Sequence, residues 1–512
     1  MAPFEQDLFV ELVGLLLEEE YTERALYWLE ELKNMSVASF YNNPALKAQV
    51  LDESDLLLDY TLHNRLERLR SGLPSATPAE RLELHKEIVL ALEQLNNLQR
   101  RVIRHAPAID LDLPGLQRHL GRSEAIVHYS LLSGRSNDLL MATLITTSGI
   151  YMHPIVFTNI EIERIKQLVE ELSADRLDLT ELQWLRERVL DPLPLPGNLK
   201  SLYVIPDGFL YELPLEMFPQ GQVSGPMAYG ETHYLVESVA ISYANSLRDL
   251  QRAFGQQPQR SYAIDLLAMG ISIFSGEESR LGTGFALSPL PLAEEEVRRI
   301  SNRLDRTPNH RLFLAGESRE SAFRAHSSDA RIIHIASHSE VYESDPLYSL
   351  IYLHGDNDPH NPEHDGHIYA YELFGMNLNS EMVVLNSCES GAGSYIQGSG
   401  IMGFSRAVKY AGAHSLMMNL WKIRDRSAFE LSVRFYENLN SGMRKNEALR
   451  EAKKHHINYV NSNPLHWAPL VMYGNVDALP NERRYVSLIT IATVLFLLLA
   501  FFATIHYRKR AF

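Results

Sequence analysis

Two stretches decide the fold: Arg331–His338, which reads RIIHIASH, and Met382–Gly393, which reads MVVLNSCESGAG. Each begins with a short apolar run typical of a buried β-strand and ends in polar or small residues. Similar strand runs alternate with helical runs in this part of the chain, which predicts a mostly parallel sheet. His338 and Cys388 follow their strands directly, at the sheet edge where α/β proteins bind ligands.

These two side chains could form a nucleophile and its base. Cys388 is the only cysteine in the chain, and it lies where a strand meets a glycine-rich loop rather than inside the strand, where structural cysteines usually pack. His338 could take the thiol proton, leaving a thiolate that attacks a carbonyl and an imidazolium that protonates the leaving amine. The sequence thus indicates a Cys-His dyad.

Other polar residues near the dyad have open roles. His334 lies inside its strand, where we expect burial with a satisfied ring nitrogen, so it is the weaker candidate for the base. Asn386, Ser387 and Glu389 could orient the dyad or satisfy the turn, and the sequence does not separate these options. No third member of a triad is assigned.

The chain divides into a helical region at 1–110, a first α/β half at 111–260 and a second at 261–480. The polar segment 255–260, GQQPQR, separates the two halves. Strands are expected near Ala125–Tyr129, Leu139–Ile145, Leu202–Ile205, Ala263–Ile273, Arg311–Leu314, Arg331–Ala336, Met382–Asn386 and His414–Leu420. Helices are expected near Ile160–Leu190, Ala293–Leu304, Arg319–Ala325, Gly400–Ala411 and Arg426–Asn440.

The N-terminal region has apolar residues at spacings of three and four, as in Leu26, Leu29 and Leu32, which predicts amphipathic helices. The segment Ala25–Lys33 resembles one helix of a tetratricopeptide hairpin, although no clear 34-residue repeat is present. A degenerate helical platform is the better description. An activating protein could bind the chain through it.

Near the other end, Val486–Ile505 is an uncharged run of 20 residues. As a helix it would span roughly 30 Å, the hydrocarbon thickness of a bilayer. A buried core helix is the alternative, but threonines are the only strongly polar interruptions, and basic residues bracket the run. Because no signal peptide opens the chain, we expect a C-terminal membrane anchor with the other domains in the cytoplasm.

Composition excludes several classes of function. A formal net charge of −16 opposes binding to nucleic acid, which requires a basic face. A single cysteine excludes an intramolecular disulfide and a thiolate zinc site. The hydrophobic fraction of 45% is that of a globular chain able to bury a core.

Two further motifs are weak. Gly398–Gly403, GSGIMG, matches the dinucleotide fingerprint but begins about a dozen residues past its strand. The loop His354–His367 carries several carboxylates and histidines, but their spacing fits no defined metal site, and a solvated loop is the simpler interpretation. We therefore predict no cofactor and no metal, while the loop leaves metal binding open.

From about Arg122 to Val476 the chain resembles a CHAT domain, a bacterial relative of caspases and separases. The spacing of 50 residues between His338 and Cys388 agrees with the caspase pattern. The resemblance rests on the motifs Ile205–Glu216, Ile335–His338 with Asp345–Ser349, Val384–Gly391, Gly403–Ala407, Tyr410–Ala413, Asn419–Asp425, Phe435–Tyr436, His466–Pro469 and Tyr473–Gly474. It implies a caspase-like three-layer α/β fold with an inactive half before the active one, and it assigns His338 as base and Cys388 as nucleophile.

The resemblance also implies an oxyanion hole formed by the backbone N–H groups of Ser339 and Cys388. The family commonly has glycine where this chain has Ser339, whose side chain restricts the backbone. Asp425 resembles a separase aspartate that meets the basic side chain before the scissile bond, which implies a preference for Arg or Lys. Asp425 could instead be a helix N-cap, and the neighbouring Arg424 would weaken the pocket's negative potential if it pointed inward.

The sequence therefore predicts a membrane-anchored cysteine endopeptidase that cleaves a cytoplasmic protein, with regulated proteolysis in stress or antiviral defence suggested by the resemblance. One alternative is a catalytically silent membrane-bound scaffold that uses its CHAT domain for protein interaction. A second alternative is a nucleotide-responsive signalling protein that uses Gly398–Gly403.

Overall fold

The structure is a computed structural model that describes most of the chain beyond residue 110. The described residues are 22–37, scattered positions between 55 and 94, and 111–133, 138–256, 262–274, 287–304, 309–341, 349–356, 364–373, 376–386, 405–409 and 411–479. Cys388, Gly398–Gly403 and the apolar run Val486–Ile505 lie outside them.

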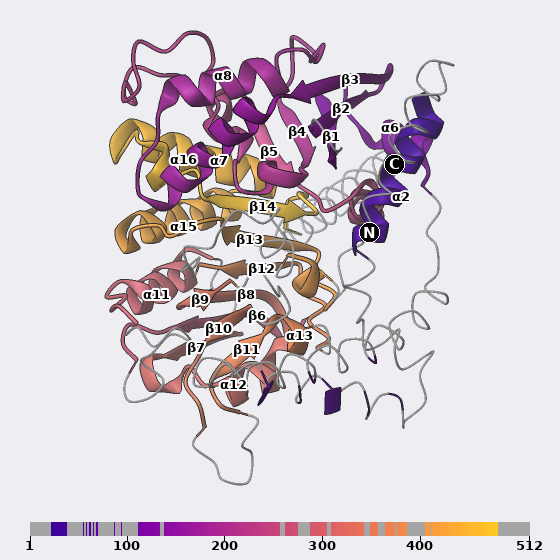
Figure 1. Cartoon of the computed structure of the whole chain (residues 1–512). Helices are drawn as coiled ribbons and strands as arrows, with labels where there is room; N and C mark the ends of the chain where they lie inside the picture. Colours follow the sequence, from indigo (N-terminus) through magenta and orange to yellow (C-terminus); the bar gives the residue numbers. More distant parts are fainter. Residues whose placement is uncertain are drawn as a thin grey trace, which may run out of the picture.

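One large sheet runs through the molecule. Its 11 strands are ordered β3-β2-β1-β4-β5-β14-β13-β12-β8-β6-β7, from near the top of Figure 1 to near the bottom. Their bounds are β1 Glu124–Ser133, β2 Asp138–Thr146, β3 Gly149–Phe157, β4 Ser201–Ile205, β5 Ala240–Tyr243, β6 Ile264–Gly270, β7 His310–Leu314, β8 Ala330–Ala336, β12 Met382–Leu385, β13 Ser415–Asn419 and β14 Leu470–Gly474.

A second, three-stranded antiparallel sheet has the order β11-β10-β9 and follows directly from β8. Its strands are β9 Ser339–Glu340, β10 Leu350–Tyr352 and β11 His367–Tyr369. The chain therefore leaves the large sheet after Ala336 and enters the small one at Ser339, with two residues between the strands. His338 lies at this junction.

Helices cover the large sheet. Their bounds are α2 Thr22–Val37, α6 Leu113–His119, α7 Asn159–Ser173, α8 Leu179–Val189, α9 Leu235–Ser238, α10 Leu247–Gly255, α11 Ala293–Arg303, α12 Glu320–His326, α13 Ala370–Leu373, α15 Asp425–Asn440 and α16 Lys445–Tyr459. Short 3-10 helices lie at Gly208–Tyr211, Leu215–Met217, Ala315–Glu317, Ser327–Asp329 and Pro464–His466. Helices α11, α15 and α16 pack side by side at the left of Figure 1, whereas α2 and α6 lie at the right.

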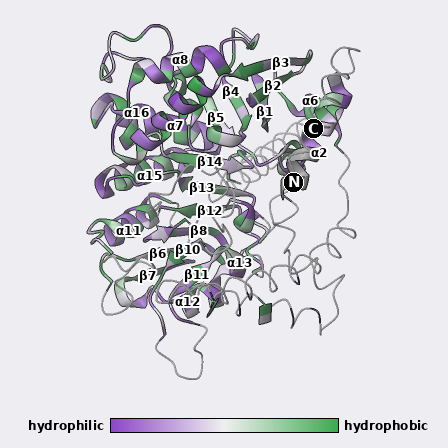
Figure 2. Cartoon of the chain, viewed as in Figure 1, coloured by the Kyte–Doolittle hydropathy of each residue, from purple (hydrophilic) through white to green (hydrophobic). Residues whose placement is uncertain are grey.

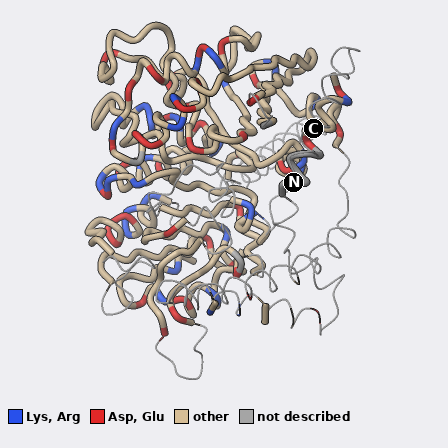
Figure 3. The backbone as a smooth tube through the Cα atoms, viewed as in Figure 1, with Lys and Arg blue, Asp and Glu red and all other residues tan. Residues whose placement is uncertain are grey.

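Burial follows the sequence pattern of the strands. Every residue of β4, β5, β12, β13 and β14 is buried, as expected of strands covered on both faces. Figure 2 shows these central strands as predominantly hydrophobic, and Figure 3 places most charged residues on the helices and loops around them. The central strands therefore form part of the hydrophobic core.

All eight predicted strands are present, with bounds within a few residues of those expected. The prediction of a mostly parallel sheet is correct around β8, which pairs in parallel with both β6 and β12. The large sheet as a whole is mostly parallel, with antiparallel pairing at two places. Strands β1, β2 and β3 form an antiparallel meander, and β14 runs antiparallel to β13.

Three strands of the large sheet were not predicted: β3, β5 and β14. The parallel pairing of β14 with β5 is what joins strands from 111–260 and 261–480 into one sheet. Because the described halves share a continuous sheet and core, the polar segment near residue 260 does not separate two independent sheets.

The N-terminal helix α2 packs on the first half. Ala25 and Leu29 contact Leu132 and Met141, and the buried Glu30 carboxylate accepts hydrogen bonds from backbone N–H groups at the start of α10. The prediction of a helix here is confirmed for Thr22–Val37. In the part of the chain that the structure describes, no helix has the length and apolar character needed to cross a bilayer.

Candidate functional site

Strand pairing brings the two predicted active-site segments to the same sheet edge. Strands β8 and β12 are adjacent and parallel, with Ile335 opposite Leu385, so the residues that follow each strand emerge together. Ser337 and His338 follow β8, and Asn386 follows β12. The predicted nucleophile Cys388 is two residues beyond Asn386 in the sequence and outside the described residues.

These segments line one pocket. Its walls are Leu290, Ala293, Glu296, Ala336, Ser337, His338, Asn386, Asn419, Lys422, Ile423, Asp425 and Ala428. They come from the ends of β8, β12 and β13, the start of α15, and helix α11 with the segment before it. The pocket therefore lies at the carboxyl ends of three parallel strands, where α/β folds place their ligand sites.

His338 is held by a backbone group from the segment before α11. Its Nε2 lies 2.7 Å from the carbonyl oxygen of Ser288, and only 2% of the residue is exposed. A carbonyl oxygen can only accept, so Nε2 carries the hydrogen, and the lone pair of the neutral ring is on Nδ1. The Phe274 ring packs against the imidazole with centroids 5.9 Å apart. A histidine in this tautomer can accept a proton at Nδ1.

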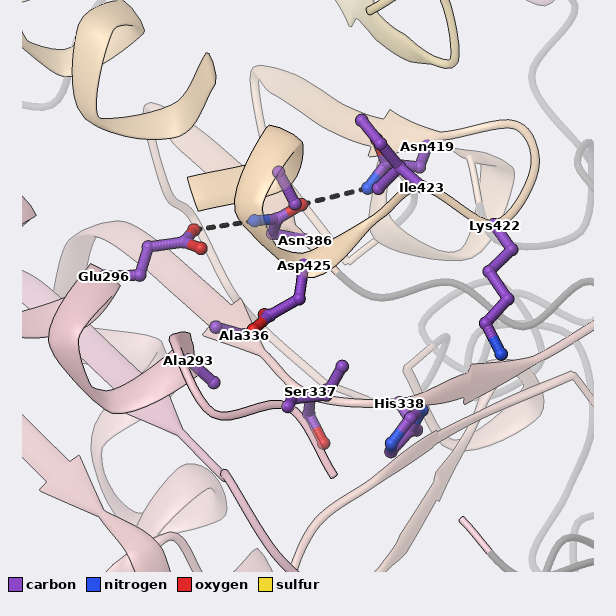
Figure 4. Close-up of a pocket in the computed structure, with 12 residues that line it drawn as sticks. Ala293, Glu296, Ala336, Ser337, His338, Asn386, Asn419, Lys422, Ile423 and Asp425 are labelled. Carbon is purple, nitrogen blue, oxygen red and sulfur yellow. Dashed lines mark hydrogen bonds between the residues drawn. The ribbon is translucent and has the colours of Figure 1, made fainter. Parts of the chain in front are cut away.

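A chain of buried polar side chains forms one wall of the pocket. Asn386 donates its amide N–H to the Glu296 carboxylate at 2.7 Å and accepts a hydrogen bond from the Asn419 amide at 3.0 Å. Figure 4 shows Glu296, Asn386 and Asn419 in a row, with Asp425 between this row and Ala336. His338 and Lys422 lie toward the right of the view, below Asn419. These hydrogen bonds join α11, which carries Glu296, to the ends of β12 and β13. The carboxylate only accepts hydrogen bonds, so it fixes the orientation of the Asn386 amide.

His334, the competing histidine, is completely buried inside β8. Its Nε2 lies 3.0 Å from the Glu296 carboxylate, and its Nδ1 lies 3.3 Å from the Tyr436 hydroxyl. Burial raises the pKa of Tyr436 well above its usual value, with the Glu296 charge as the second cause, so the phenol stays protonated. The predicted burial of His334 is confirmed, and this ring is not among the pocket-lining side chains.

Asp425 lies in the pocket, and its carboxylate accepts a hydrogen bond from the backbone N–H of Leu292 at 2.9 Å. Burial raises the pKa of Asp425, the Leu292 hydrogen bond opposes this, and the nearby Glu296 charge raises it further, so the net direction is upward. The N-cap alternative is wrong for α15, because Arg424 is the cap residue and Asp425 is the first helical residue. Asp425 instead anchors the start of α11.

The basic neighbours of Asp425 point away from the pocket. The Arg424 side chain is 70% exposed and lies 3.7 Å from Asp175, while Arg426 is 80% exposed and pairs with Glu430 at 3.0 Å. Neither of these guanidinium groups reduces the negative potential of the pocket at close range. Lys422 is the basic side chain among the pocket-lining residues.

Ser339, the predicted oxyanion donor, is the first residue of β9 and is buried. It faces Ile351 of β10, and the flanking bond runs from the Tyr352 N–H to the His338 carbonyl. This register makes Ser339 and Ile351 a non-hydrogen-bonded pair, in which the backbone N–H points away from the partner strand. The Ser339 N–H is therefore not used in pairing with β10, although this position has a serine and not the family's common glycine.

The loop His354–His367 is described at its two ends, and residues 357–363 lie outside the described residues. His364 Nδ1 lies 3.1 Å from Asp356, whose carboxylate also accepts the Ser321 hydroxyl. Among the described residues no group of three or more histidine, cysteine or acidic side chains is arranged to hold a metal.

Sequence reasoning missed three parts of the site: the Ser288 carbonyl, Glu296 and Asn419. A signal for Glu296 was present, since Ala293, Val297 and Ile300 form the apolar stripe of α11 and Glu296 falls on that stripe. A charged residue on a buried stripe requires a polar partner. No comparable local signal marks a backbone carbonyl such as that of Ser288.

A family model described as the CHAT domain matches residues 179–475, more than half of the chain. Among solved structures, the chain is similar to the Arg-specific cysteine proteinase gingipain R, with 10% identity and a TM-score of 0.35, over 62% of this chain and 74% of that one. It is also similar to the Saccharomyces cerevisiae separase–securin complex, with 11% identity and a TM-score of 0.41, over 91% of this chain and 37% of that one. No curated protein matches the chain.

Proposed function

Because the chain belongs to the CHAT domain family, we propose that it is a caspase-like cysteine endopeptidase in which His338 is the base and Cys388 the nucleophile. One observation carries the proposal. His338, whose Nε2 lies 2.7 Å from the Ser288 carbonyl oxygen, lines the same pocket as Asn386, which precedes the only cysteine of the chain by two residues.

The proposed reaction forms an acyl-enzyme on Cys388 and then hydrolyses it. Nδ1 of His338 takes the Cys388 thiol proton, and the thiolate attacks the scissile carbonyl carbon to give a tetrahedral oxyanion. The backbone N–H groups of Ser339 and Cys388 bind that oxyanion, as the orientation of the Ser339 N–H away from β10 supports. The imidazolium then protonates the leaving amine, and water hydrolyses the acyl-enzyme with His338 again acting as base.

We further propose that the pocket binds a basic side chain before the scissile bond. Asp425 and Glu296 both line it together with one lysine, Lys422. The guanidinium groups of Arg424 and Arg426 are exposed and pair with Asp175 and Glu430. A bound guanidinium or ammonium would pair with Asp425 and would also favour the charged form of that carboxylate. Arg or Lys is therefore the expected residue.

The cellular setting is proposed from the sequence. Val486–Ile505 would anchor the enzyme in a membrane, with its other domains in the cytoplasm, and this would raise its effective concentration near membrane substrates. The N-terminal helical region would receive an activating protein. Stress or antiviral defence, through regulated cleavage of a cytoplasmic protein, is the proposed role.

The test uses the full chain in lipid vesicles with a fluorogenic peptide library that varies the residue before the scissile bond. Cleavage is expected for the wild type and should be abolished in Cys388→Ala and His338→Ala, while circular dichroism shows unchanged folding. Cleavage at the wild-type rate by Cys388→Ala would overturn the assignment. A wild-type chain that a thiol-directed peptide ketone never labels would favour the alternative of a silent scaffold.

A further inference from the structure

The four residues from Ser337 to Glu340 carry both the proposed base and the proposed oxyanion donor, yet they belong to no long element. Strand β8 ends at Ala336, and the two residues of β9 belong to the small sheet. A short connection of this kind keeps its geometry only if other groups hold it. The neighbouring strand β10 supplies several of those groups, and its residue Tyr352 contributes through both its backbone and its side chain.

Tyr352 makes three hydrogen bonds to this connection. Its backbone N–H donates to the His338 carbonyl at 2.9 Å, and its carbonyl accepts the Ser337 hydroxyl. Its phenol donates to the Glu340 carboxylate at 2.7 Å. These contacts bracket His338 and Ser339 on both sides along the chain.

The hydrogen-bonded side chains of Tyr352 and Glu340 are both buried. Tyr352 is 1% exposed and Glu340 is 4% exposed. A buried carboxylate only accepts hydrogen bonds, so loss of the phenol hydroxyl would leave Glu340 one donor short and favour movement of the connection. Phe274 packs edge-on against Tyr352, with centroids 6.2 Å apart, and also packs on His338. Tyr352 and His338 are thus held by one ring.

We propose that Tyr352 and Glu340 form a positioning pair that sets the orientation of His338 and of the Ser339 backbone N–H in the peptidase reaction. This inference rests on the proposed function. Neither side chain needs to touch the substrate. Their effect on the rate would come through the backbone of Ser337–Glu340, since catalytic groups lose efficiency when displaced by a fraction of an ångström.

The test measures kcat and KM per active site, with sites counted by titration with a lysine or arginine peptide acyloxymethyl ketone. Tyr352→Phe should lower kcat per titrated site by about tenfold, with KM changed less than about twofold. Tyr151→Phe, at an exposed position on β3, is the matched control and should leave both values unchanged. A loss of activity explained entirely by fewer titrated sites would show a merely structural role and overturn the inference.

A second pair of variants decides the question if Tyr352→Phe does not fold. Glu340→Gln keeps an oxygen that accepts the phenol hydroxyl and should retain kcat, whereas Glu340→Ala should lose it by a similar factor to Tyr352→Phe. If Tyr352→Phe does fold, the double variant of Tyr352→Phe with Glu340→Ala should be no slower than either single variant, because the two residues act as a unit. Equal kcat values in Glu340→Gln, Glu340→Ala and the wild type would overturn the pair.

The two experiments distinguish a failure of the proposed function from a failure of this inference alone. If the wild type shows no Cys388-dependent cleavage, the peptidase assignment falls and the positioning pair falls with it. If cleavage depends on Cys388 but kcat per site is indifferent to Tyr352 and Glu340, only the positioning pair falls.

Discussion

The Nε2 atom of His338 lies 2.7 Å from the backbone carbonyl oxygen of Ser288, a residue 50 positions earlier in the chain. The contact joins the end of β8 to the segment that leads into α11. It determines which ring nitrogen carries the hydrogen, and it would stabilise an imidazolium during turnover because the carbonyl dipole faces the N–H. In the proposed mechanism, this backbone carbonyl would have the orienting role that a carboxylate has in a Ser-His-Asp triad.

Because the backbone supplies this contact, the Ser288 side chain should be dispensable. Ser288→Ala is expected to change kcat/KM by less than about twofold, the range typical of substitutions that disturb no buried contact. His338→Ala, measured in parallel, should abolish cleavage. A large loss in Ser288→Ala would show that the hydroxyl, rather than the carbonyl, matters for catalysis.

Glu296 should be important for stability as well as for the site. Glu296→Ala removes the acceptor for Asn386 and the partner of the buried His334, and it should lower the free energy of unfolding by about 3 kcal/mol. The matched control is Glu295→Ala on the same helix, where the side chain is 45% exposed and pairs with Arg299. Urea denaturation should show a change below about 0.5 kcal/mol for the control. Equal changes in the two variants would contradict the role of the buried carboxylate.

The strand ends at this site were predictable from sequence for a local reason. The apolar runs of β8 and β12 stop at Ala336 and Leu385, and parallel strands of one sheet end at a common edge. The Ser288 contact was not predictable, because it depends on where a segment outside the strands packs in three dimensions. Glu296 was intermediate, since the apolar stripe of α11 marks it as buried but does not identify its partners.

Asp425 should make recognition of basic substrates dependent on pH. Protonation of the carboxyl removes the charge that pairs with Arg or Lys, and burial together with the Glu296 charge raises the pKa of Asp425. KM for a lysine or arginine peptide should therefore rise as pH falls, beginning at a higher pH than an ordinary aspartate would give. A norleucine peptide serves as the neutral control and should show no such rise.

Asp425→Asn tests the same pocket without changing pH. The preference for arginine over norleucine should fall by at least about tenfold, because one partner of a partly buried ion pair is lost. The ratio of the two kcat/KM values gives the measurement and cancels any general loss of activity. An unchanged ratio would exclude Asp425 as the specificity residue.

The strands that sequence reasoning missed share physical features that hide them. β5 and β14 are four and five residues long, and each is buried on both faces, so neither shows a period-two pattern. β3 is an edge strand that contains Pro154, which weakens its strand signal. The pairing of β14 with β5 is a contact between distant segments, and local periodicity carries no information about it.

The two halves are also joined by a buried ion pair, which predicts a large stability effect. Lys453 of α16 lies 3.1 Å from Glu216 of the first half, with side chains 0% and 2% exposed, and Tyr243 also donates to Glu216. Lys453→Met would leave the carboxylate without its cation and should lower the free energy of unfolding by about 3–5 kcal/mol. Adding Glu216→Leu should recover much of that loss, as measured by urea denaturation. A double variant as unstable as the single one would show that lost packing, not an unpaired charge, is responsible.

The docking of α2 should weaken in acid because of Glu30. Burial alone would raise the pKa of this carboxyl, but hydrogen bonding and charge interaction with His128, with bonds from Arg248 and Leu247, lower it to about 2 from an ordinary 4.5. Because its pKa is lower in the folded state, the ionised Glu30 carboxylate stabilises the fold above pH 4.5. This contribution is lost as the pH falls toward 2. The gap in unfolding free energy between the wild type and Glu30→Gln should therefore shrink by about 2 kcal/mol from pH 6 to pH 3.

Glu23→Gln, on the exposed side of α2, is the control and should show a constant gap. Increased proteolysis within 22–37 in Glu30→Gln at neutral pH would locate the effect at the helix, whereas a gap for Glu30→Gln that is independent of pH would contradict the role of this carboxylate.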